Sequence, residues 1–305
     1  MEILSKAVPI TMVAFVLSSM LSMGLSLTVG QILAPLRNYR LIVLGLVANF
    51  VLMPFAAFAI ARLFRLDEPL GIALILLGTA SGAPFLPVLA RISKGNLAFS
   101  VGLMVLLMVV TVGYMPVVLP LMLEGVSVDP MKIGRSLVFL MLLPLAVGLL
   151  VRARLTGLAA KAQPSLSRLS ILSLALLIAL LLITNMQNVL NLYGTRGVFA
   201  SILFIAAGSG IGWVLGGPQS DTRGVMVLGT AQRNIAAALV VGGQNFSDPR
   251  VIVMVVVVAI VGLLMLMPLA KYLAKFSQPA GEQVDNSSKL QSLEQNVSDG
   301  ARRGL

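Results

Sequence analysis

The chain of 305 residues contains no cysteine and no histidine. Without cysteine it can form neither a disulfide nor a thiolate that attacks a substrate or binds a metal. Without histidine it lacks the commonest metal ligand and the side chain that most often exchanges protons near neutral pH. Chemistry that depends on either residue type is therefore excluded, including the histidine motifs of zinc proteases.

Charged residues are scarce as well. They make up 11% of the chain, against about 25% in soluble domains, while 58% of the residues are hydrophobic. The apolar residues form runs of about 20, which is long enough to cross a bilayer as a helix. We expect an all-α polytopic membrane protein whose transmembrane domain covers residues 1–275. About nine transmembrane helices are expected, at residues 7–30, 39–64, 69–91, 97–122, 132–152, 165–190, 197–217, 222–245 and 249–274.

The net charge of +11 comes mostly from Lys and Arg in the short loops between apolar runs. The loops after the odd-numbered spans carry more of them than the loops on the other side. The positive-inside rule then predicts an N-terminus outside and a C-terminus in the cytoplasm, in a plasma (inner) membrane. The partner of these charges is thus the lipid bilayer, and no nucleic acid is expected. Residues 276–305 are polar and predict a disordered cytoplasmic tail.

Acidic residues are absent from the interior of every expected span, because all eleven lie in loops, at span edges or in the termini. Proton-driven transporters usually carry an acid or histidine relay in the membrane, and this chain has none. The spans contain no histidine or acid that could act as a general base for a serine, so an enzyme within the membrane is disfavoured. A channel is disfavoured too, because the polar residues concentrate in two places instead of lining several spans.

These two places echo each other. One reads GTASGAPFLPVLA from Gly78, and the other reads GTAQRNIAAALVV from Gly229. In the predicted topology the first lies on a span that runs inward and the second on a span that runs outward. Interrupted helices at matching positions of two antiparallel halves are the signature of an inverted-repeat transporter. We therefore expect two discontinuous helices that cross near the membrane centre.

Proline explains the first interruption. Pro84 has no N–H and should leave the carbonyl of Ala80 without its helical partner, and Pro87 should do the same for Ala83. Gly82 permits an unusual backbone conformation between them. The alternative is a purely structural proline kink. The candidate site residues here are Thr79, Ser81, Gly82, Pro84 and Pro87.

The second interruption is polar, with Thr230, Gln232, Arg233 and Asn234 in the middle of a span. An arginine at the centre of a membrane helix costs about 2.5–3.5 kcal/mol on the insertion scale. Since no acid lies within a span, carbonyls, amides or an anionic ligand must satisfy Arg233. The alternative is an arginine held by carbonyls for structure alone.

We expect the Arg233 donors to hold the carbonyls of Ala80 and Ala83, together with Gln232. Polar side chains at this depth should face a water-filled crevice, because lipid cannot satisfy them. The expected accessible positions are Thr79, Ser81, Thr230 and Asn234.

Several stretches resemble the bile acid:sodium symporter family. They include SMGLSLT at residues 22–28, ANFVLMPFAAFAIARLF at residues 48–64, the passage around GTASGAPFLPVLA, and GTAQRNIAAALV. The resemblance extends to about residue 275 and is to members with nine spans. It implies a panel made of spans one, five and six, and a core made of the other spans. It also implies a substrate crevice between these parts and two sodium ions behind the crossing.

The resemblance also shows which family sodium ligands are missing. A Ser–Asn pair of the family falls on Leu86 and Pro87, and its acidic ligand falls on Leu228. The polar remnants of the cation sites are Asn49, Ser100 and Gln232. The resemblance thereby makes Asn49 a further expected partner of Arg233. Sodium coupling of the usual kind is therefore not expected, and neither is any other cofactor or a metal site.

Together these observations favour a secondary transporter that moves a small organic anion by alternating access without sodium. One alternative is a sodium-coupled symporter that binds the ion through neutral oxygens. Another is a membrane sensor that transports nothing.

Overall fold

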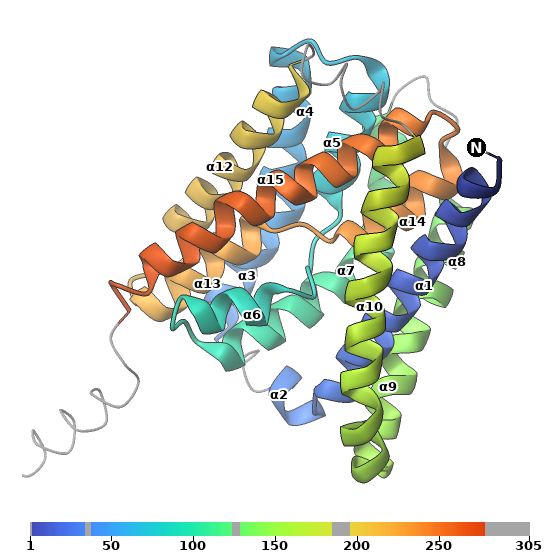
Figure 1. The fold of residues 1–305 in the computed structure, drawn as a ribbon. Coiled ribbons are helices and arrows are strands. Elements are labelled where there is room, and N and C mark those ends of the chain that lie inside the picture. Colours follow the sequence, from blue (N-terminus) through green and yellow to red (C-terminus); the bar gives the residue numbers. More distant parts are fainter. Residues whose placement is uncertain (1, 34–37, 124–128, 185–195, 278–305) are drawn as a thin grey trace, which may run out of the picture.

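A computed structural model describes residues 2–33, 38–123, 129–184 and 196–277, and every regular element in these ranges is a helix (Figure 1). Eight of these helical segments are long and apolar enough to cross a membrane. The chain is thus an integral membrane protein with multiple spans. The α-helices are α1 (Glu2–Ser26), α2 (Val29–Leu33), α3 (Tyr39–Val47), α4 (Met53–Leu63), α5 (Glu68–Thr79), α6 (Leu86–Ile92), α7 (Leu97–Met122), α8 (Pro130–Leu137), α9 (Leu143–Arg154), α10 (Thr156–Thr184), α12 (Gly197–Leu215), α13 (Ser220–Ala231), α14 (Ile235–Asn245) and α15 (Pro249–Leu273).

The expected spans differ from these helices in three places. The first span, expected to end at residue 30, ends at Ser26, and the separate short helix α2 follows it. The third span, expected at 69–91, is divided into the two short helices α5 and α6, so it is not one of the eight long segments. The sixth span begins at Thr156 and not at 165, because the good helix formers of residues 158–163 extend α10 toward its N-terminus and Pro164 is accommodated inside it. The expected end of that span at 190 and the tail from 278 onward lie outside the described residues.

Two spans contain a π-helical turn, η2 (Ala48–Leu52) before α4 and η3 (Val138–Leu142) before α9. In each, a proline is the second residue of the helix that follows, Pro54 in α4 and Pro144 in α9. A proline has no N–H for the carbonyl four residues earlier, so Phe50 loses its helical partner. The hydroxyl of Tyr114 on α7 donates to the Phe50 carbonyl instead. The turn η2 thus ties the second span to the fourth.

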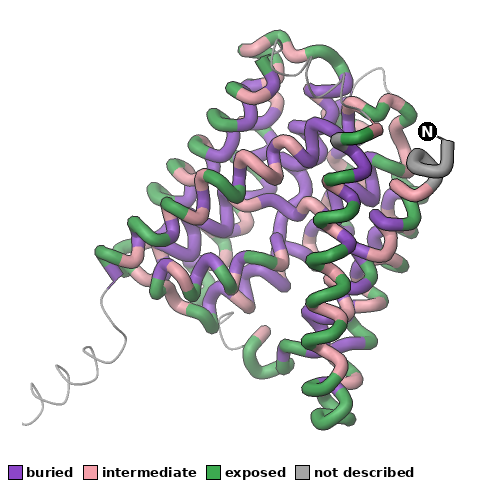
Figure 2. Tube along the Cα trace, in the orientation of Figure 1, coloured by how far each residue is buried: buried purple, intermediate pink, exposed green. Residues whose placement is uncertain are grey.

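The helices form two groups. The helices α1, α9 and α10 lie side by side, and α12, α13, α15, α4 and α5 pack on the other side of the molecule (Figure 1). Figure 2 shows α10 as mainly exposed or intermediate, whereas the chain through α5, α13 and α14 is largely buried. Large apolar side chains such as Phe139, Leu172 and Val214 are exposed, as expected of surfaces that face lipid.

The segment Ser220–Asn245 is the most enclosed and the least apolar of the eight candidate spans, with 89% of its most apolar window buried. Neighbouring helices surround it, so its polar residues do not face lipid. This enclosure allows the second polar interruption to exist at membrane depth.

Glycines allow α12 to lie directly against α13. Gly208, Gly212 and Gly216 recur every four residues on one face of α12. A Cβ on Gly208 would lie 2.7 Å from the Ala231 Cα, and one on Gly216 would lie 2.7 Å from the Arg223 Cα. Such small-residue faces are the usual basis of close helix packing in membranes. The stripe therefore holds α13, and the interruption at its end, in place.

Replacing Gly212 by Ala should separate α12 from α13. The new Cβ would overlap the Met226 carbonyl oxygen and lie 2.6 Å from the Val227 Cα, and neither backbone atom can move aside. We expect a loss of about 1–3 kcal/mol, as for other overpacked sites, measured as a lower unfolding temperature of the detergent-solubilised protein. Gly210→Ala on the same helix is the matched control, because no atom lies within 4 Å of its added Cβ. Equal unfolding temperatures of the two variants would contradict this account of the packing.

Candidate functional site

The two interruptions predicted from the sequence lie against each other. The first comprises residues 80–85 between α5 and α6, and the second comprises residues 232–234 between α13 and α14. The backbone N–H of Asn234 donates to the Ala80 carbonyl at 3.0 Å. The Asn234 side-chain amide donates to the carbonyls of Ser81 and Gly82, at 3.3 and 3.0 Å. The carbonyls released by the first interruption are thus satisfied by the second.

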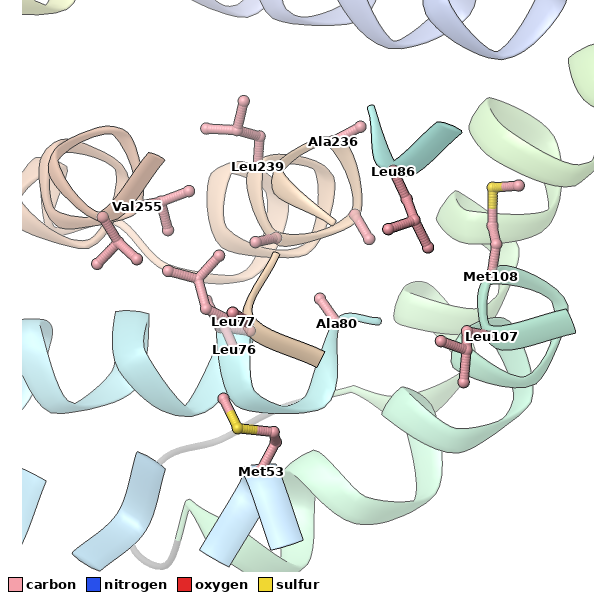
Figure 3. Packing of buried hydrophobic residues seen from close by; sticks show 14 of the residues in the cluster. Met53, Leu76, Leu77, Ala80, Leu86, Leu107, Met108, Ala236, Leu239 and Val255 are labelled. Atoms are coloured by element: carbon pink, nitrogen blue, oxygen red, sulfur yellow. The ribbon is translucent and has the colours of Figure 1, made fainter. Parts of the chain in front are cut away.

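Apolar side chains close the surroundings of this contact. Figure 3 shows Ala80 at the end of α5, with Leu76 and Leu77 before it. Met53 of α4, Leu107 and Met108 of α7, and Ala236 and Leu239 of α14 gather around it. The polar contacts between the interruptions therefore lie in a low-dielectric environment, where hydrogen bonds are strong and unpaired polar groups are costly.

Gly82 has the special conformation that the sequence predicted. Its φ of +78° lies in the left-handed region that favours glycine, and a Cβ at this position would overlap the backbone nitrogen of Met108 on α7. The expected effect of Pro87 is wrong, however. Pro87 is the second residue of α6, so it begins a helix instead of interrupting one, and the Ala83 carbonyl accepts from the Leu86 N–H at 3.1 Å. Pro84 lies in the turn that precedes α6.

Arg233 is 3% exposed, and its guanidinium makes four hydrogen bonds. Nε donates to the Leu77 carbonyl at 2.7 Å and Nη2 to the Gly78 carbonyl at 2.7 Å. Nη1 donates to Asn49 Oδ1 at 2.8 Å and to the Thr230 carbonyl at 3.1 Å. The guanidinium therefore joins the last turn of α5, the last turn of α13 and the π turn η2.

The position of Arg233 follows from helix electrostatics. The last carbonyls of a helix have no partner within it, and the helix dipole adds a partial negative charge at that end. Arg233 lies where two such ends, those of α5 and α13, meet. Hydrogen bonds to a charged group contribute about 1.5–3 kcal/mol each. Four of them outweigh the insertion cost of about 2.5–3.5 kcal/mol for a central arginine.

The expected partners of Arg233 are correct only for Asn49. The carbonyls that it binds are Leu77, Gly78 and Thr230, and not Ala80 and Ala83, and Gln232 makes no hydrogen bond to it. The reason is that the end of α5 exposes its own terminal carbonyls to the guanidinium, while Asn234 and Leu86 already occupy Ala80 and Ala83.

Two polar residues that the sequence analysis did not single out belong to the site. Thr111 Oγ1 accepts from the Ser81 N–H at 3.0 Å and donates to the Ser81 carbonyl at 3.1 Å. The Tyr114 ring packs against the Phe50 ring at a tilt of 56°, with ring centroids 4.8 Å apart. Their spacing of three residues places both on one face of α7, and that pattern was visible in the sequence. The Ser81 hydroxyl in turn donates to Asn49 Oδ1 at 2.8 Å.

The expected crevice is wrong for this conformation. Thr79, Ser81, Thr230 and Asn234 have no exposed surface, because most of their polar groups are satisfied by the facing segment and by their own helices. Two buried side-chain oxygens have no partner among the described residues, Thr230 Oγ1 and Gln232 Oε1. Ser100, expected as a remnant of a cation site, donates to the Leu97 carbonyl of its own helix at 2.7 Å, and within the described ranges it forms no hydrogen bond to Asn49 or Gln232.

The chain is similar in sequence to known transporters. The profile described as "Sodium Bile acid symporter family" matches residues 13–192. The chain is 27% identical over 202 residues to the "Uncharacterized sodium-dependent transporter YocS" of Bacillus subtilis, covering 65% of this chain and 60% of that protein. It is 24% identical over 246 residues to the "Probable sodium/metabolite cotransporter BASS1, chloroplastic" of Oryza sativa, covering 79% of this chain and 60% of that protein.

A third relative is the "Hepatic sodium/bile acid cotransporter" of Rattus norvegicus. It is 27% identical over 156 residues, which cover 49% of this chain and 43% of that protein. The chain therefore spans about 60% or less of the length of these three relatives.

Asn234 should contribute more to the stability of the protein than an ordinary helix cap does. Its side chain accepts from the Ala237 N–H at the start of α14 and also donates to Ser81 and Gly82. Asn234→Ala should cost about 1 kcal/mol for the cap and about 1–3 kcal/mol more for the Gly82 carbonyl left unpaired, since Thr111 still donates to the Ser81 carbonyl. Asn38→Ala is the control, because Asn38 caps α3 with a single acceptor bond to Leu41. Equal losses of unfolding temperature in the two variants would show that the contact between the interruptions adds no stability.

Proposed function

The chain belongs to the sodium bile acid symporter family, and from this we propose that it is a secondary transporter that moves an organic anion across the membrane by alternating access. The family is one of transporters, so the chain is not an enzyme. The segment α5–α6 and the segment α13–α14 would be the two discontinuous crossing helices of an inverted repeat. Their interruptions and the hydrogen bonds between them support this assignment.

The two parts that would move are the panel, made of α1, α8, α9 and α10, and the core, made of the other long helices. On one side of the molecule they are joined by hydrogen bonds, since Lys132 and Ser136 of α8 donate to Gln244 near the end of α14. Such bonds must break when the crevice opens on that side. Because the polar groups of the site are buried here, we take this as a conformation closed around the crossing.

An organic anion suits the charge of the site. Arg233 provides a buried positive charge, and the described part of the chain places no carboxylate against it. Four of its five N–H donors are occupied, which leaves one for a ligand oxygen. Thr230 Oγ1 and Gln232 Oε1 would accept hydrogen bonds from hydroxyl or amide groups of the same ligand.

We further propose that transport does not require sodium. The position of Arg233 supports this proposal. Its guanidinium binds the carbonyls at the ends of α5 and α13, where such carbonyls could otherwise bind a sodium ion. At the position of the family's acidic ligand stands Leu228, which is fully buried. The names of the relatives refer to sodium, and this proposal separates the chain from them.

One alternative has an observation in its favour. Thr230 Oγ1 and Gln232 Oε1 are unpartnered oxygens, and a sodium ion bound through neutral oxygens could use them. A guanidinium and a sodium ion at close range repel each other, so this arrangement is less favourable than an anion.

Uptake of taurocholate, hippurate and lactate into proteoliposomes tests the proposal. The membrane potential is held at zero, and sodium is compared with an impermeant organic cation. We expect uptake of at least one anion at the same rate in both media. Arg233→Met should lower that rate at least tenfold because the positive charge is lost, whereas Arg233→Lys should keep part of it.

Arg62→Met is the matched control, because Arg62 is exposed at the end of α4 and only covers the ring of Phe58. It should transport like the wild type. The proposal is wrong if wild-type uptake rises steeply with sodium and Arg233→Met leaves it intact. The wild-type comparison alone decides on sodium, even if a variant at Arg233 does not fold.

A further inference from the structure

Arg233 and a coupling sodium ion would differ in what happens to their charge during transport. A sodium ion enters on one side, leaves on the other and adds its charge to the cargo. Arg233 is part of the chain and returns to its starting place in every cycle, wherever it moves in between. Its charge can attract an anion, but it contributes nothing to the net charge that crosses the membrane.

The charge carried per cycle is therefore set by the anion alone. The four acceptors of Arg233 are backbone carbonyls and one amide, none of which takes up a proton at physiological pH. All eleven acidic residues lie outside the span interiors, so no carboxylate there carries a proton along. For a monoanion the net charge moved is −1.

The protein can also complete the transport cycle without a bound anion. Arg233 has internal partners for four of its five N–H donors, and its charge faces the ends of α5 and α13. Without a bound anion the site therefore holds no unsolvated cation that would prevent the return step. A return without cargo makes the protein a uniporter and removes the need for exchange.

We infer that this protein is an electrogenic uniporter of organic monoanions, which an inside-negative membrane potential drives outward. The inference rests on the proposed function and adds the direction of transport and the charge number. A coupled symporter that carries two sodium ions with each monoanion would move a net charge of +1, and the same potential would drive its substrate inward.

The size of the effect is large enough to measure. One elementary charge across 100 mV corresponds to about 2.3 kcal/mol, or an equilibrium accumulation ratio of about 50. Opposite signs of the charge number therefore differ by a factor of about 2500 in the ratio expected at this potential, which no uncertainty in protein orientation can hide.

The experiment uses the full chain in sodium-free proteoliposomes, with potassium gradients and valinomycin to set the potential. The probe is taurocholate, or hippurate if taurocholate is not carried, since both are monoanions. We expect accumulation of about 50-fold at 100 mV inside positive, and depletion at the same potential inside negative. Arg233→Lys keeps the charge in the chain, so it should slow the flux without changing the accumulation ratio. Protein-free liposomes give the leak.

Each other outcome contradicts the inference. Accumulation at an inside-negative potential would mean that more than one cation accompanies each anion. A flux that ignores the potential would mean electroneutral exchange or coupling to one cation. If sodium-free flux is present but has one of these dependences, the inference fails while transport of an anion stands. If no anion moves under any condition, the proposed function itself fails.

Discussion

The guanidinium of Arg233 between the ends of α5 and α13 is the contact on which the interior of this protein depends. Each part of it requires the others. If α5 continued by one more turn, the Leu77 and Gly78 carbonyls would bond within the helix and the arginine would have no acceptors. If the arginine were absent, the three carbonyls of Leu77, Gly78 and Thr230 would lose its hydrogen bonds in an apolar environment, and Asn49 would keep only its bond from Ser81. The interruption of the helices and the buried charge are one feature.

The rest of the site extends this contact. Asn49 accepts from both Arg233 and Ser81, and Ser81 is held by Thr111 on the neighbouring helix α7. Pro54 follows the π turn that carries Asn49, and the hydroxyl of Tyr114 donates to the Phe50 carbonyl, for which this proline has no N–H. Pro54 and Gly82 thus shape the backbone, and neutral polar side chains complete the hydrogen bonds. No acid is needed, since helix ends and an amide balance the charge.

Much of this was predictable from the sequence, and the failures share a cause. The order of the spans, the two interruptions and the role of Gly82 follow from local residue chemistry. The pairing of Arg233 with Asn49 followed from the resemblance to the family. Which carbonyls Arg233 binds could not be predicted in this way, because that depends on how far the end of α13 lies along α5. Sequence spacing says nothing about that distance. The crevice was expected because polar groups in lipid need water, yet here the two interruptions satisfy each other. The predicted start of α10 was wrong because good helix formers extend this helix beyond the hydrophobic run.

The enclosed position of Ser220–Asn245 also bears on how the protein is made. This segment is the least apolar of the candidate spans, so its own partition into lipid is the weakest. The groups that neutralise its arginine come from η2 and α5, which are synthesised more than 150 residues earlier. We therefore expect this segment to be stable in the membrane only after those earlier helices have assembled beside it. The hydrogen bonds from Arg233 to the second and third hydrophobic segments would then set the order in which the chain is assembled.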